Sequence, residues 1–171
     1  MDFKNFIPDF KSVSKTDWAK PNLDTKNNMW LLTAGAAVLM LIFTFLKWDS
    51  VTYYGASDSA MGVQTWSGFV GLLCALCALY GALYNKIQFV FCAAVVGVVV
   101  ALIGWLSWPV YEVTEIDQFD NEKVKTLTAQ DFKEAIKEGK CTISHIGAIL
   151  YLVASLAAAA VSFWQIKKAN E

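Results

Sequence analysis

The chain has 171 residues, of which 56% are hydrophobic and 17% charged, and its formal net charge is -1. So high an apolar content excludes one ordinary soluble domain of this length and makes a membrane protein the expected class. All the basic residues are lysines and they form no basic cluster, so the sequence gives no electrostatic support for nucleic-acid binding.

Residues 1–28 form a polar head of mixed charge that is partly amphipathic. Its apolar side chains Phe3, Phe6, Ile7 and Phe10 mark one helical face. Such a stripe among lysines suits the membrane surface or a groove on a partner, so these four residues are interaction candidates. A solvated tail is the alternative.

Four apolar runs follow, and none contains an Asp, Glu, Lys or Arg residue. Because backbone groups in hydrocarbon must be satisfied within their own segment, runs of this length are expected to be helices. The predicted fold class is all-α, a four-transmembrane-helix antiparallel bundle with a short extramembrane loop helix. The expected transmembrane domain is 29–166, with spans at 29–46, 66–84, 87–108 and 142–164, and the tail is 167–171.

The first span is bracketed by Trp30 and Trp48, which we interpret as interfacial anchors. The loop 47–65 follows, and the alternation of Val51, Tyr53 and Gly55 within it is compatible with a short strand. The second and third spans are separated by two residues, which requires a tight helical hairpin.

The other loop, 109–141, contains a short amphipathic helix by its end signals. Thr128 is a suitable N-cap, Asp131 stands at the third helical position, and Gly139 follows the last turn. Phe132 and Ile136 lie on its apolar side, and we expect them either to dock a partner or to belong to a solvated cap.

Four spans put both termini on one side of the membrane. Lys86, Lys167 and Lys168 flank the spans on that side, and this lysine excess favours the cytoplasm. The expected location is the bacterial inner (plasma) membrane, with both termini cytoplasmic.

Small residues recur at helical spacing in the second and third runs. They are Gly68, Gly71, Ala75, Ala78, Gly97 and Gly104. Such stripes allow the close approach of helix backbones in lipid. They predict packing within the bundle, with a homo-oligomer interface as the alternative.

Two features have the residue types of chemical sites. Cys141 and His145 stand four residues apart, a spacing that would put half of a metal site on one helix face. The favoured interpretation of His145 is a boundary histidine that makes a hydrogen bond. Cys74 and Cys77 form a Cys-x-x-Cys pair in a four-span chain, which resembles the disulfide-generating quinone oxidoreductases of bacterial inner membranes. The resemblance implies thiol-redox chemistry, although those enzymes have a second pair in the long loop, where this chain has Cys141 alone.

The Leu46-Lys47-Trp48 exit of the first span and the Ile-Gly-x-x-Leu-Tyr-Leu opening of the last, 146–152, resemble uncharacterised four-span bacterial membrane proteins. The outline is also similar to that of claudins and tetraspans, but the claudin signature cysteines are absent from the loop 47–65. These resemblances imply a fold and no chemistry.

The expected function is that of a non-enzymatic integral membrane protein, an accessory or scaffold subunit of a membrane complex or a homo-oligomer. Its expected partners are the lipid bilayer and either other membrane-protein subunits or a second copy, without nucleic acid. No catalytic, cofactor or metal residue is predicted. A thiol-redox enzyme using Cys74 and Cys77, and a small channel or carrier, are the alternatives.

Overall fold

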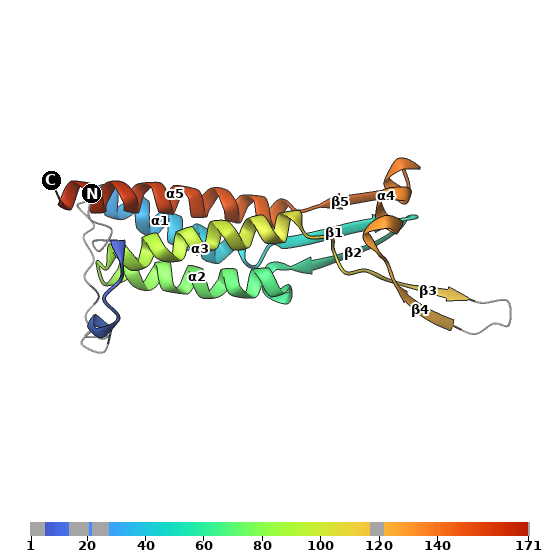
Figure 1. Ribbon diagram of the computed structural model, residues 1–171, viewed down its shortest axis with the longest axis horizontal. Helices are drawn as coiled ribbons and strands as arrows, with labels where there is room; N and C mark the ends of the chain where they lie inside the picture. Colours follow the sequence, from blue (N-terminus) through green and yellow to red (C-terminus); the bar gives the residue numbers. More distant parts are fainter. Residues whose placement is uncertain (1–5, 14–20, 22–27, 117–121, 171) are drawn as a thin grey trace.

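The computed structural model describes residues 6–13, 21, 28–116 and 122–170. Helices lie side by side in one half of the elongated molecule, and strands extend from one of their ends (Figure 1). We call this the sheet end. The opposite, terminal end contains the start of the first helix, the turn between the second and third, and the end of the last. The four packed helices are α1 (Asn28–Phe43), α2 (Trp66–Leu83), α3 (Ile87–Leu106) and α5 (Ile146–Ala169).

The predicted all-α class is wrong, because the described residues also form two antiparallel sheets and the fold is mixed α/β. Four of the strands come from the predicted loops, and most of the fifth falls in the predicted fourth span. The strands are β1 (Lys47–Tyr53), β2 (Ala56–Met61), β3 (Glu112–Ile116), β4 (Glu122–Thr126) and β5 (Cys141–Ser144). One sheet has the order β2-β1-β5, and the other is the β3-β4 pair.

The central strand β1 joins segments that are far apart in the sequence. It pairs with β2 through a two-residue turn, in which Tyr54 (φ 48°) and Gly55 (φ 86°) both have left-handed backbone conformations, as a type I′ hairpin requires. On its other edge, Val51 is opposite Ile143 of β5. The strand suggested by the alternation at Val51 is therefore present, but it runs from Lys47 to Tyr53, and Gly55 lies in the turn.

Three helices of the described residues, α2, α3 and α5, are long and apolar enough to cross a membrane, whereas α1 has only 16 residues. The predicted first span ended at 46, but α1 ends at Phe43, because the chain then turns and the N–H groups of Val63 and Gly62 donate to the carbonyls of Thr44 and Leu46. The predicted fourth span began at 142, but residues 141–144 form β5 and α5 begins at Ile146.

The predicted loop helix is confirmed as α4 (Ala129–Lys137). The Thr128 hydroxyl accepts a hydrogen bond from the Asp131 N–H, and the Asp131 carboxylate accepts one from the Thr128 N–H at 2.7 Å. These reciprocal bonds satisfy the donors that a helix start leaves open. Gly139, with φ 69°, follows the helix and allows the chain to turn back into β5.

Two buried clusters hold the molecule together. The cluster between the helices consists mainly of alanines, with Met40, Trp48 and Tyr151 as its largest fully buried apolar side chains. The second cluster lies at the sheet end, where its residues come from β1, the linker after α3, the segment 127–135 and β5. Its buried members are Val51, Tyr111, Leu127, Phe132, Ala135 and Cys141.

Candidate functional site

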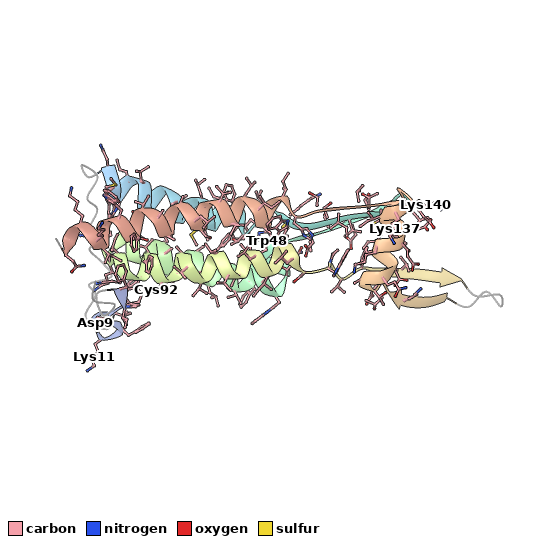
Figure 2. The ribbon with its side chains drawn as sticks, turned by 45° about the horizontal axis from the view of Figure 1, so that its top comes forward. Asp9, Lys11, Trp48, Cys92, Lys137 and Lys140 are labelled. Atoms are coloured by element: carbon pink, nitrogen blue, oxygen red, sulfur yellow. The ribbon has the colours of Figure 1, made fainter. Side chains whose placement is uncertain are left out.

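Trp48, the second residue of β1, lies at the junction between the helices and the sheet (Figure 2). Its side chain is 1% exposed, and glycines of four different segments surround it. These are Gly62 of the short 3-10 helix η3 (Gly62–Gln64), Gly71 of α2, Gly104 of α3 and Gly147 of α5. We call this arrangement the glycine socket.

The socket requires glycine because the indole and the neighbouring backbone occupy the space of a side chain. A Cβ atom on Gly147 would lie 2.6 Å from the Lys47 carbonyl oxygen, and one on Gly104 would lie 3.2 Å from Trp48 Cε3. The indole N–H of Trp48 donates to the Phe43 carbonyl at 2.9 Å, so the buried ring leaves no unpaired donor. β1 is thereby fixed to the helices at its first residues.

A second connection between sheet and helices lies beside the socket. Nδ1 of His145, the residue before α5, is 2.8 Å from Oδ1 of Asp49 in β1. Both side chains are mostly buried, so this pair is screened less by solvent than a surface ion pair would be. The two groups orient one another at the point where β1, β5 and α5 meet.

A cleft of about 420 Å³ at the sheet end lies between the β1–β2 face, the start of α2 and the linker after α3. We call it the sheet-end cleft. Its ionisable carboxyl groups are Asp49 and Asp58, and its aromatic side chains are Trp66, Trp108 and Tyr111. The other polar side chains that line it are Ser59, Gln64, Thr65, Ser67 and Ser107.

Phe132 anchors α4 on the sheet. Its ring stacks on Trp108 with 5.9 Å between centroids and meets Tyr53 edge-on at 6.3 Å. Burial, together with the neighbouring Tyr54, raises the pKa of Tyr53. Phe132 is fully buried, so this interaction candidate is a core residue of the sheet end, whereas Ile136 on the next turn is exposed.

Cys141 and His145 do not share a helix face, because Cys141 begins β5 and only residues after His145 are helical. Burial raises the pKa of the Cys141 thiol, which disfavours the thiolate that metals bind. Within residues 6–13, 21, 28–116 and 122–170, no three His, Cys, Asp or Glu side chains are grouped as metal ligands would be.

The Cys-x-x-Cys pair is divided between two environments on α2. Cys74 is buried among the helices and Cys77 is exposed on their outer surface, and both are free thiols. Cys92 of α3 lines the same apolar groove as both of them, so a third thiol stands near the pair that the sequence suggested.

Two of the head candidates, Phe6 and Phe10, contact the helices at the terminal end. The Phe6 ring packs on Phe91 of α3 at 5.3 Å and on Phe163 of α5 at 5.6 Å. Ile7 and Phe10 are exposed, and Phe10 marks the start of the short 3-10 helix η2 (Phe10–Ser12). Phe3 lies outside the described residues.

The six small residues proposed for helix packing all lie buried in contacts within this one chain. A Cβ on Gly68 would collide with the backbone of Gly62, and one on Gly97 would lie 3.0 Å from the Ser155 hydroxyl. The others, in the same buried interior, are Gly71, Ala75, Ala78 and Gly104.

Sequence reasoning missed Trp48 as a core residue, since a tryptophan at the end of an apolar run suggests an interfacial anchor. Trp30 is buried as well, and its indole N–H donates to the Ala82 carbonyl at 2.8 Å. The available signal for the socket was the set of glycines near the helix ends.

No family model, no curated protein and no solved structure matches the chain.

Proposed function

We propose that the chain is a non-enzymatic integral membrane protein whose sheet end is a docking unit for other membrane-protein subunits or for a second copy. Large apolar side chains on the outward faces of the helices support the membrane placement, since a soluble protein would have polar residues there. They include Leu32, Ile42, Leu73, Val95, Val99, Ile103, Val153 and Leu156.

We further propose that the terminal end faces the cytoplasm, with the bacterial inner membrane as the location. Lys86 at the α2–α3 turn and Lys167 and Lys168 in the last turn of α5 support this orientation. Lysines beside spans are retained on the cytoplasmic side. The sheet end then lies on the opposite side of the membrane.

The observation that carries the docking role is the β3–β4 hairpin, which projects from the sheet end (Figure 1). In the described part of the chain, β3 and β4 pair with one another and with no third strand. Val124 of β4 is 67% exposed. A two-stranded ribbon is marginally stable in water, and a partner that covers Val124 would stabilise it.

Site-specific photo-crosslinking in native membranes tests this role. A photoreactive residue at Val124 is expected to give one discrete cross-linked product, either with a second copy or with one other membrane protein. The matched control is the exposed Ser57 of β2, where we expect none. A protein that purifies in gentle detergent as a monomer, without a cross-link at Val124, would contradict the docking role.

A further inference from the structure

We propose that the sheet-end cleft binds an ammonium group, supplied either by a lipid headgroup or by a soluble amine. This site is separate from the β3–β4 docking surface, because none of the residues that line it belongs to that hairpin. The proposal rests on the shape of the cleft, the sign of its charge, its aromatic walls and its place at the end of the helices.

The ionisable side chains favour a cation. Asp49 and Asp58 contribute carboxylates, whereas no lysine or histidine among the described residues lines the cleft. The Asp49 carboxylate is hydrogen-bonded to the ring of His145. Asp58 has no such basic neighbour in the described structure: its Oδ1 accepts a hydrogen bond from the Ser59 N–H at 2.7 Å. A cation in the cleft would balance this charge.

The register of the sheet brings the two carboxylates to one face. Side chains alternate between the faces of a strand, so Asp49 and Val51 lie on the same face of β1. Val51 is opposite Asp58 in the β1–β2 pair. Residues directly opposite one another share a face, which puts Asp58 beside Val51 and on the same side as Asp49.

Two tryptophans are among the residues that line the cleft. Trp66 begins α2 and Trp108 follows α3, and tryptophan ring faces attract ammonium groups. The Trp108 ring already stacks on Phe132 and lies 5.8 Å from the Lys133 ammonium, so the exposed Trp66 ring is the one that a ligand would meet.

The hydroxyl and amide side chains complete the chemistry that an ammonium group needs. Thr65 and Ser107 line the cleft, and each hydroxyl has oxygen lone pairs that accept from an N–H donor. An ammonium group has three N–H donors and no acceptor. A wall of carboxylates and hydroxyls therefore matches it better than it matches a phosphate.

The position of the cleft makes a lipid headgroup accessible to it. Trp66 is 79% exposed at the first residue of α2, where a helix that crosses the membrane would meet the headgroup layer. The volume of about 420 Å³ accommodates a small headgroup, while the open side would leave acyl chains in the bilayer.

Two arms of one experiment distinguish the sources. In the lipid arm, the protein is placed in nanodiscs of phosphatidylglycerol with a minor fraction of phosphatidylethanolamine, and native mass spectrometry counts the retained lipids. In the soluble arm, ethanolamine is titrated into the protein in maltoside micelles, and tryptophan fluorescence reports binding. Selective retention of phosphatidylethanolamine alone identifies a lipid site, and saturable binding of ethanolamine identifies a soluble-amine site.

Asp58→Asn is the decisive variant, because its amide oxygen still accepts from the Ser59 N–H while the charge is removed. We expect about a tenfold loss of binding in whichever arm is positive, the size of one charge-assisted hydrogen bond. Trp66→Leu should weaken binding about two- to fivefold, as an exposed cation–π contact would.

Glu112→Gln is the matched control, since Glu112 is an exposed acid of the sheet end that does not line the cleft. It should leave binding unchanged. The proposal is overturned if neither arm shows binding, if Asp58→Asn binds as the wild type does, or if Glu112→Gln weakens binding equally. None of these results bears on cross-linking at Val124, so failure of this site and failure of the docking role remain distinguishable.

Discussion

The ring of Trp48 lies 5.2 Å from the ring of Tyr151, centroid to centroid, at an interplanar angle of 57°. The Tyr151 hydroxyl in turn donates to the Gly71 carbonyl at 2.7 Å. This single aromatic pair connects β1, α5 and α2, at the level where the helices end and the sheet begins. This buried contact therefore helps to fix the position of the sheet end relative to the helices.

Trp48→Ala should destabilise the protein by about 3–5 kcal/mol, because it removes a fully buried indole and leaves a cavity among the helices. Thermal unfolding in detergent micelles, followed by near-UV circular dichroism, measures the change. Trp66→Ala is the matched control, and its effect should stay within roughly 0.5 kcal/mol, since that side chain is exposed. Equal losses in the two variants would exclude the socket as the main connection.

Gly147→Ala should cost about 1–3 kcal/mol, since the new methyl group would overlap the Lys47 carbonyl and the Trp48 ring. Gly35→Ala in α1 provides the opposite case, because nothing lies within 4 Å of its Cβ position. That change should be neutral or stabilise by about 0.5–1 kcal/mol through helix propensity. The same unfolding assay compares the two, and a destabilising Gly35→Ala would contradict the packing described.

The α4 cap should be sensitive to acid. Hydrogen bonds from Thr128, with a smaller contribution from Lys125, lower the pKa of Asp131 below its ordinary value. A lowered pKa stabilises the folded state above about pH 4, and this contribution is lost as the pH falls through the folded-state value. Hydrogen exchange of the α4 amides, corrected for intrinsic rates, should therefore accelerate between pH 5 and about pH 3 in the wild-type protein. The acceleration should be smaller in Asp131→Asn, which has no carboxyl group at this position to titrate. An identical pH profile in that variant would show that the cap does not titrate.

Thiol labelling separates a structural role of the cysteines from a redox role. In maltoside micelles, a small maleimide that partitions into detergent should modify Cys77, which lies on the outer surface of α2, faster than Cys74, which is buried. Residues three apart on a regular helix do not readily form a disulfide, so adding a quinone should leave the labelling of Cys77 unchanged. Loss of labelling at both thiols on quinone treatment, restored by a reductant, would instead support the thiol-redox alternative.

The helical part of the fold could be predicted because its signals are local. Long uncharged runs identified the cores of α2, α3 and α5, and the Thr128 and Asp131 capping pair identified the start of α4. In each case the residues that determine the element lie within the element, so periodicity and end signals were sufficient.

The strands were harder to predict because their partners are distant. Residues 141–144 are continuous with the apolar run of α5, and they become a strand only because Thr142 and Ile143 pair with β1, about ninety residues away in the sequence. The β3–β4 hairpin has charged residues at Glu112 and Lys125, which indicated a solvated loop and concealed the strand pairing.

The socket was also beyond local reasoning. Gly71 and Gly104 were recognised as small packing residues, but the side chain that they accommodate belongs to a different segment, and Trp48 had been assigned to the membrane surface. Asp49 and His145 are 96 positions apart in the sequence. Their pairing is therefore visible only once β1 and α5 are placed together.

The side of the membrane that each end faces is the most direct test of the account. In a variant without native cysteines, Ser57→Cys in β2 and Lys168→Cys in α5 each introduce one exposed thiol, at the sheet end and the terminal end respectively. An impermeant maleimide applied to intact bacterial cells should label the thiol at position 57 and reach the one at 168 only after permeabilisation. Three results would contradict a chain whose helices cross the bilayer between the two ends. Both positions could be labelled in intact cells, neither position could be labelled before permeabilisation, or the protein could be recovered in the aqueous fraction.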